Sequence, residues 1–368
     1  MSPRLAGSAG ELRGNNCEEM AATSSAPPNP GEASMPDGIL PASHWQQTQL
    51  PAVNDDADSA YGSQWSETTS LSSSVRRYRV LQGRTYHADI GAAESWEPND
   101  NRHIESMDLL HFMVTLVMGD KLFLAPVENP QKVLDVGTGT GLWAIEFGDL
   151  YPGAEVIGTD ITPIQPSWVP PNVRFEIEDA NLDWAREDNT FDFIHARTLT
   201  GNILHWDHFF AEAYRCLKPG GWLESQELDF GWKVLDGEIP EDSAMGQYVK
   251  VWHAGGEKTG RSFRVVDDNL QEKWMERAGF VDIEVKDLFC PYGAWPEDPR
   301  EKEAGILSKA AFENDMEGYI LHIWHAVLGW TPEEIQNYVA HLRRELRNPN
   351  LKIYFKRRVV IGRKPQNL

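Results

Sequence analysis

The stretch Lys132-Val-Leu-Asp-Val-Gly-Thr-Gly-Thr-Gly-Leu-Trp-Ala-Ile-Glu-Phe-Gly148 decides the fold of this chain. Residues 133–136 form a short, mostly apolar run, typical of a strand buried on both faces of a parallel sheet. The alternating Gly137, Gly139 and Gly141 then allow a tight turn and bring backbone N–H groups close to a ligand, because no Cβ intervenes. Apolar side chains follow at helical spacing. A strand, a glycine loop and a helix in this order predict a nucleotide pocket in an α/β protein.

The spacing of the glycines indicates which nucleotide. The dinucleotide fingerprint needs a glycine at position 142, which is leucine, and the Gly-Lys-Ser/Thr of NTPase phosphate loops is absent. A Gly-x-Gly-x-Gly loop preceded by Asp135 instead resembles the first motif of class I S-adenosylmethionine-dependent methyltransferases. That ligand has no phosphate, so a loop without lysine is sensible. The motif implies cofactor contacts from Asp135, Thr138 and the three glycines; an ordinary glycine-rich turn is the alternative.

Two further carboxylates support a cofactor site. A second apolar run ends in Asp160, followed by Ile161, about 20 residues after the glycines, where a nucleotide fold holds ribose hydroxyls. Hydrogen bonds to a charged acceptor are worth about 1.5–3 kcal/mol, so Asp160 should determine affinity strongly. A third strand at 173–177 leads to Asp179 and Ala180, where this fold binds the adenine amino group; a simple loop acid is the alternative.

Three residues are candidates for a general base. His195 should lie at the carboxyl end of a strand at 191–197, where ligands bind in open α/β sheets, so it could contact the cofactor or accept a proton. A histidine satisfied by backbone hydrogen bonds fits the pattern equally well. Glu227, in a strand at 222–229, and His205 are the other candidates. Methyl transfer depends mainly on alignment, so we expect no catalytic triad and at most one base.

Charge and composition exclude some partners. The 368 residues carry a formal net charge of −22, which argues against nucleic acid because affinity for phosphates comes from clustered Lys and Arg. Basic residues concentrate at 343–347 and 356–358, where a solvated helix end and strand edge are favoured over a nuclear import signal. No signal peptide is visible, and no apolar run reaches about 18 residues, so we expect no membrane partner.

Metal and redox sites are also not expected. Cys17, Cys216 and Cys290 are far apart and match no zinc or disulfide-exchange spacing. His322 and His325 lie three apart on one helical face, but no third ligand is within reach, so a structural role is favoured. These features predict a cytoplasmic protein in a reducing compartment, with a nuclear location as the alternative.

The chain is expected to have two parts. Residues 1–74 are rich in Ser, Pro, Gly, Asn, Asp and Ala without periodicity, and they are predicted to be disordered because they cannot bury enough apolar surface. Residues 75–368 are predicted to form the methyltransferase domain, with a helix over 108–124 before the first strand. An insertion at about 291–350 is predicted to be a helical lid over the substrate, its second helix starting at the N-cap Thr331.

Further segments make the resemblance more specific. They are Tyr86-His87, Pro98-Asn99-Asp100, Asp108-Leu-Leu-His111, 133–144, Asp160-Ile-Thr-Pro-Ile-Gln-Pro166, 191–197, 217–223 and Gly362-Arg-Lys-Pro365. Over residues 80–365 the sequence thereby resembles the fungal LaeA-like methyltransferases. One departure is Ser106, two residues before the Asp of Asp-Leu-Leu-His, where family members often carry an arginine. This departure puts any cofactor contact from that arginine in doubt.

The resemblance implies a Rossmann-like class I α/β fold, with a seven-stranded, mostly parallel sheet, an antiparallel last strand and S-adenosylmethionine as the cofactor. It also implies two functional branches. One contains enzymes that methylate an oxygen or nitrogen of small molecules or peptides in fungal secondary metabolism, and we favour this interpretation. The alternative is a nuclear regulator of secondary metabolism that acts in a complex with velvet-type proteins.

Overall fold

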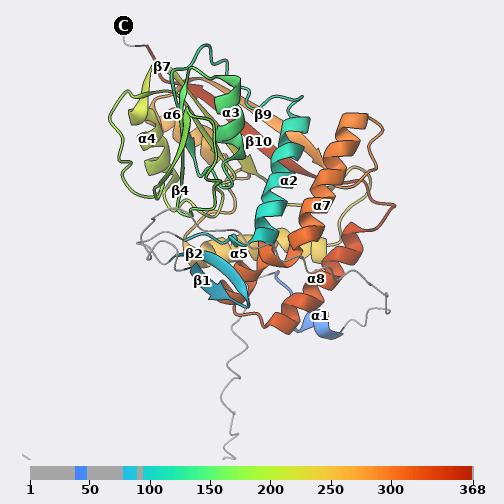
Figure 1. The fold of residues 1–368 in the computed structure, drawn as a ribbon. Coiled ribbons are helices and arrows are strands. Elements are labelled where there is room, and N and C mark those ends of the chain that lie inside the picture. The colour runs from blue at the N-terminus through green and yellow to red at the C-terminus, as the bar shows by residue number, and fades with distance from the viewer. Residues whose placement is uncertain (1–37, 48–77, 89–93, 367–368) are drawn as a thin grey trace, which may run out of the picture. The chain divides into compact units, whose positions relative to one another are not determined.

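A mostly parallel β-sheet is the centre of the fold, in a computed structural model that describes residues 38–47, 78–88 and 94–366 (Figure 1). The described residues all belong to one compact unit, Pro36–Leu368. The longer strands of its main sheet are β3 (Lys132–Val136), β4 (Glu155–Asp160), β5 (Val173–Ile177), β6 (Phe191–Arg197), β7 (Leu217–Leu228), β9 (Val281–Pro291) and β10 (Ile353–Arg363). They follow the order β5-β4-β3-β6-β7-β10, and β9 also pairs with β10.

The strand order and directions confirm the predicted Rossmann-like class I fold. β3 pairs in parallel with β4 and β6, whereas β10 runs antiparallel to β7 and β9. All the strands predicted from the sequence are present. The sheet contains one more strand than predicted, because the two-residue β8 (Lys233–Val234) pairs with Ile353 and Tyr354 at the start of β10.

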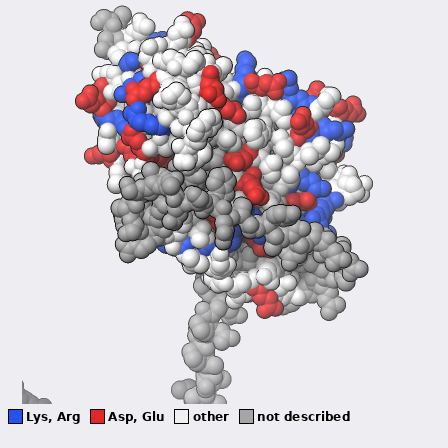
Figure 2. Space-filling model, in the orientation of Figure 1, with Lys and Arg blue, Asp and Glu red and all other residues white. Residues whose placement is uncertain are grey.

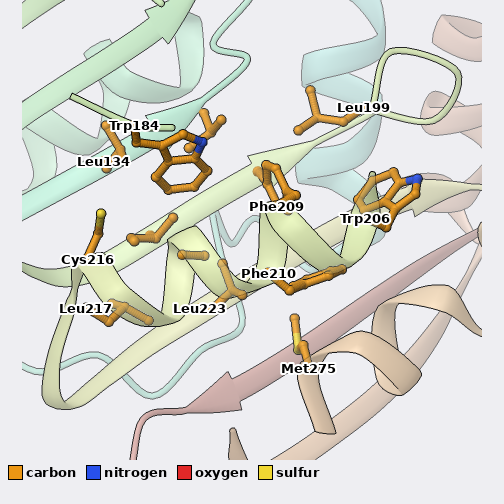
Figure 3. Packing of buried hydrophobic residues seen from close by; sticks show 14 of the residues in the cluster. Leu134, Trp184, Leu199, Trp206, Phe209, Phe210, Cys216, Leu217, Leu223 and Met275 are labelled. Atoms are coloured by element: carbon orange, nitrogen blue, oxygen red, sulfur yellow. The ribbon is translucent and has the colours of Figure 1, made fainter. Parts of the chain in front are cut away.

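Apolar packing fixes the helices that cover this sheet, α3 (Leu142–Leu150), α4 (Trp206–Cys216) and α6 (Leu270–Ala278). Side chains of α4 and α6 meet the sheet in one buried cluster (Figure 3). Its fully buried members include Phe209, Phe210, Cys216, Leu223 and Met275. Burying such a side chain contributes about 1.5–3 kcal/mol, so the cluster holds the strand ends on which the site is built.

The helix before β3 starts earlier than the predicted 108–124. This helix, α2, spans Asn101–Val117, because Asp100 accepts a hydrogen bond from the His103 N–H as its N-cap. The first turns of α2 are polar, so the apolar periodicity did not reveal them. Of these polar residues, Arg102, His103 and Ser106 hydrogen-bond to α7 (Pro299–Leu321), which lies beside α2 (Figure 1).

The insertion before β10 forms the two helices that were predicted. They are α7 and α8 (Pro332–Leu346), separated by a π-helical turn at His322–Val327. Thr331 is the N-cap of α8, as predicted, and forms a reciprocal capping box with Glu334. Helix α7 is interrupted at Asp315, whose φ and ψ of −136° and 39° are not helical. Helix α5 (Ala244–Thr259) packs against α8.

Residues 38–47 depart from the disorder predicted for 1–74. They include the short helix α1 (His44–Gln47), and Trp45 is buried against α8. Gln247 of α5 hydrogen-bonds both to the N–H of Leu40 and to the carbonyl of Gly38. The rest of the predicted disordered segment lies outside the described residues. Order was predicted from residue 75, and the described chain resumes with a hairpin of β1 (Tyr78–Leu81) and β2 (Arg84–Ala88).

Membrane and metal features were searched for in the same described residues. None of their helices combines the length and apolar character needed to cross a bilayer. No group of three or more His, Cys, Asp or Glu side chains among them could hold a metal ion. His322 Nε2 lies 3.9 Å from Glu94, and His325 Nδ1 lies 2.6 Å from the Trp330 carbonyl, so both histidines have protein partners.

Candidate cofactor and acceptor site

A cavity opens where the parallel strands end. It is lined by the glycine loop after β3, by the segments after β4, β5 and β6, and by residues of α2, α7 and β10. Most residues predicted to bind the cofactor lie together in this lining: Gly137, Thr138, Gly139, Asp160, Ile161, Asp179 and Ala180. The predicted Asp135, Gly141 and His195 are not part of it.

The glycine loop has a backbone conformation that favours glycine. φ is positive at all three glycines and is +58° at Gly139. A Cβ on Gly139 would also lie 2.7 Å from Cε of Met107 in α2. The Gly139 N–H donates to Asp160 Oδ2 at 2.9 Å, and Gln165 Nε2 donates to the Gly139 carbonyl at 2.6 Å. The Pro-Ile-Gln-Pro loop of residues 163–166 therefore holds the glycine loop directly.

Asp135 and His195 form a buried pair beneath the glycine loop. One Asp135 oxygen accepts a hydrogen bond from Thr138 Oγ1 at 2.6 Å, and the other lies 2.7 Å from His195 Nδ1. The His195 ring stacks on Trp143 with centroids 3.9 Å apart and an angle of 1° between planes. This geometry gives both residues a supporting position beneath the loop, since the Asp135 oxygens and His195 Nδ1 interact within the protein, whereas His195 Nε2 has no partner among the described residues.

Two carboxylates suit the nucleoside part of S-adenosylmethionine. Asp160 accepts hydrogen bonds from the backbone N–H groups of Thr162 and Gly139. Burial raises the pKa of Asp160 to about 6. Asp179 accepts hydrogen bonds from Asn181 through Oδ1, whereas its buried Oδ2 has no partner among the described residues. A buried acceptor left unpaired costs about 1–3 kcal/mol. An adenine amino group would supply the missing donor, so the hydrogen-bond acceptors of this site fit the cofactor.

The three candidate bases do not line the cavity. His195 belongs to the buried pair with Asp135, and His205 is exposed at the start of α4. Glu227 accepts hydrogen bonds from the N–H groups of Leu199 and Thr200 and from the Thr200 hydroxyl. Burial raises the pKa of Glu227 to about 7. The geometry assigns Glu227 to holding the loop after β6.

Several lining residues were not among the predicted site residues. They are Glu97, Asn99, Arg197, Tyr319 and Arg357. Asn99 is 7% exposed, and neither polar atom of its side chain has a partner among the described residues. Its segment, Pro98-Asn99-Asp100, contributed only to the family resemblance. No local pattern marks Tyr319 or Arg357, because their place depends on how α7 and β10 pack.

A buried polar network connects Glu97 in the cavity with α7. His103 of α2 lies 3.7 Å from Glu97 Oε1 and 2.8 Å from Asp315 Oδ2. Asp315 also accepts two hydrogen bonds from Arg84. Burial lowers the pKa of His103, but the hydrogen bonds and charges of Asp315 and Glu97 outweigh it and bring the pKa to about 9. His103 is therefore cationic at neutral pH, directly behind Glu97.

Comparison with known proteins identifies the family. Residues 109–285 match a family described as a methyltransferase domain. The chain is 31% identical to the secondary metabolism regulator laeA of Aspergillus fumigatus, over 88% of this chain and 83% of that protein. It is 39% identical to methyltransferase pytC of Aspergillus terreus, over 82% of this chain and 92% of that protein. The chain belongs to the fungal LaeA-like methyltransferases.

Membership of this LaeA-like family confirms the predicted S-adenosylmethionine-dependent methyltransferase. A solved phosphoethanolamine N-methyltransferase 2 of Haemonchus contortus, in complex with S-adenosyl-L-methionine, matches 66% of this chain and 50% of that one, with 21% identity and a TM-score of 0.41. Ser106, which departs from the family's arginine, donates to the Ala311 carbonyl of α7. Ser106 does not line the cavity, so any cofactor contact must come from other residues.

Proposed function

We propose that this LaeA-like methyltransferase transfers a methyl group to an oxygen or nitrogen of a small molecule or peptide of fungal secondary metabolism. The sequence similarity to methyltransferase pytC, over most of both chains, supports an enzyme. The observation that carries the proposal is a single cavity that runs from Asp179, on the cofactor side, to Tyr319 and Arg357 on the other side. A methyl donor and an acceptor can therefore meet in one site.

Alignment of the two reactants is the main task of the protein. S-adenosylmethionine supplies a methyl group on a sulfonium, so its departure needs no acid. Positioning two bound reactants can contribute about 7–11 kcal/mol. The glycine loop, Met107 of α2 and Tyr319 of α7 all form walls of the cavity. The lid predicted at 291–350 contributes at least Tyr319 to these walls, and closure over the acceptor is part of this proposal.

Glu97 is our proposed general base. It lines the cavity, and the cationic His103 lies behind it. A carboxylate in this position can accept the proton of a hydroxyl or ammonium acceptor. A positioned base contributes about 10²–10⁴-fold in rate, so Glu97→Gln should lower kcat by that range and leave S-adenosylhomocysteine affinity within about twofold. Glu94→Gln, on a neighbouring residue of the lining, is the matched control.

The test of the function has a binding step and a product step. Purified protein should bind S-adenosylmethionine in calorimetry, and Gly139→Arg or Asp160→Ala should abolish this binding. A strain that lacks the gene should then accumulate a metabolite lighter by one methylene unit, which the purified protein converts to the mature compound. Full activity in both variants would refute the assignment of the cofactor site.

Similarity to proteins called secondary metabolism regulators supports a second candidate function. In that case the fold serves a nuclear complex with velvet-type partners. The basic segment 356–358 gives this little support: Arg358 is paired with Asp287 and Glu272, and Arg357 faces the cavity. Acidic and basic side chains are also interspersed on the described part of the face in Figure 2. Tagged protein that neither enters nuclei nor co-purifies with such partners would exclude this candidate.

A further inference from the structure

Arg357 is a buried cation that forms no ion pair with a carboxylate of the described residues. The residue is 3% exposed and lines the cavity. Its Nη1 donates to Thr198 Oγ1 at 2.9 Å and to the Gln226 carbonyl at 3.5 Å, while its Nε has no partner among the described residues. Arginine stays charged in proteins, and an unpaired buried charge destabilises the folded state. Glu227 and Glu97 attract this charge without forming an ion pair with it, so the guanidinium can still bind an anion directly.

The strand order places Arg357 at a distance from the residues proposed to bind the cofactor. β10 is separated from β3 by β6 and β7, which corresponds to about 14 Å at about 4.8 Å between neighbouring strands. The glycine loop follows β3, and Asp160 and Asp179 follow β4 and β5 on the far side. Arg357 therefore belongs to the half of the cavity left for the acceptor.

A second guanidinium lies between the two halves. Arg197 lines the cavity at the end of β6, and its Nη2 lies 2.9 Å from His111 Nδ1. It forms no ion pair with a carboxylate of the described residues. Burial lowers the pKa of Arg197 to about 10, and the positive charge of Arg357 adds to this effect, against the opposing charges of nearby carboxylates. An anion bound near both guanidinium groups would relieve this repulsion.

We infer that the methyl acceptor carries a carboxylate, which binds Arg357 beside the Thr198 hydroxyl. A guanidinium fork matches the two oxygens of a carboxylate. Thr198 has a φ of +61°, and its N–H donates to the Gln226 carbonyl, so a fixed backbone presents this hydroxyl. Glu97, which lines the same cavity, disfavours the greater negative charge of a phosphate ester. This inference rests on the proposed function, because it names the class of acceptor.

The test uses the full chain saturated with S-adenosylhomocysteine, whose binding also reports on the proposed function. Benzoate and the neutral benzamide of the same shape are titrated by calorimetry. We expect benzoate to bind at least about tenfold more tightly than benzamide, and Arg357→Met to remove this preference. Arg264→Met, an exposed arginine paired with Asp268, is the matched control and should keep it.

Thermal unfolding of the ligand-free protein gives an independent measurement. Removing an unpaired buried charge should raise the Tm of Arg357→Met by about 2–4 °C, whereas a structural arginine would give a lower Tm. If the methionine variant does not fold, Arg357→Lys serves in its place, with weaker benzoate binding expected because the fork is lost.

Four results would overturn the inference. They are equal binding of benzoate and benzamide, absence of benzoate binding to protein that binds S-adenosylhomocysteine, tighter binding of phenyl phosphate than of benzoate, and unchanged benzoate binding by the Arg357 variants. An Arg357 variant that binds S-adenosylhomocysteine more weakly, but benzoate as tightly as the unmodified protein does, would assign Arg357 to binding the cofactor's own carboxylate. Loss of S-adenosylhomocysteine binding by the unmodified protein would instead refute the proposed function.

Discussion

The Asp135 carboxylate lies 2.7 Å from Nδ1 of His195, and the two residues are paired across β3 and β6 under the glycine loop. Asp135→Asn keeps the volume but loses the charge that accepts these hydrogen bonds. The free energy of unfolding, measured in urea, should fall by about 2–3 kcal/mol. S-adenosylhomocysteine affinity should fall as well, because Thr138 loses its partner.

The exposed Asp149→Asn on α3 is the control for Asp135→Asn and should leave both quantities unchanged. Wild-type stability together with lost S-adenosylhomocysteine binding would contradict the supporting role. That result would indicate that Asp135 contacts the cofactor directly, as the sequence motif alone predicted.

The unpaired Oδ2 of Asp179 predicts recognition of the adenine amino group. Asp179→Ala should weaken the binding of S-adenosylhomocysteine about 10–100-fold, since a hydrogen bond to a charged acceptor is worth about 1.5–3 kcal/mol. S-inosylhomocysteine lacks the amino group, so the variant should bind it as well as the wild type does. Equal losses for both compounds in calorimetry would show that Asp179 acts elsewhere.

The buried His103 predicts a pH dependence of stability. Its pKa in the folded protein, about 9, lies above the ordinary value of 6.5, so its contribution is complete below pH 6.5 and is lost as the pH rises through 9. The contribution is on the order of 3 kcal/mol. His103→Gln should therefore flatten the decline in unfolding free energy between these pH values.

The exposed His205→Gln serves as the control for His103→Gln and should keep the wild-type pH profile. Urea denaturation at a series of pH values provides the measurement. An identical slope for wild type and His103→Gln would show that the contacts with Asp315 and Glu97 do not hold the proton on His103.

Local patterns in the sequence predicted the lining residues proposed to bind the cofactor, whereas contacts between distant residues place the others. The glycine loop, Asp160 and Asp179 each follow a strand whose apolar run is visible in the sequence. Thr331 was found as an N-cap because capping depends on neighbouring residues. In contrast, the ion pair of Arg84 with Asp315 joins residues 231 positions apart, and the cavity position of Arg357 follows from the pairing of β10 with β7. His195 was placed at the correct strand end, but its burial under the loop depended on Trp143.

Trp45 provides the test of the N-terminal segment. It is 4% exposed, and its ring lies 5.1 Å from Tyr338 and 5.4 Å from His341 of α8. Replacing a buried tryptophan by alanine costs about 3–5 kcal/mol. This cost exceeds the stabilisation that the two remaining hydrogen bonds to Gln247 can provide. Trp45→Ala should therefore speed amide exchange in residues 38–47 while exchange in the central sheet stays slow. Trp168→Ala, which removes a ring that is 89% exposed, should change neither region. If residues 38–47 stay as protected in Trp45→Ala as in the wild type, the segment is held by something other than this ring.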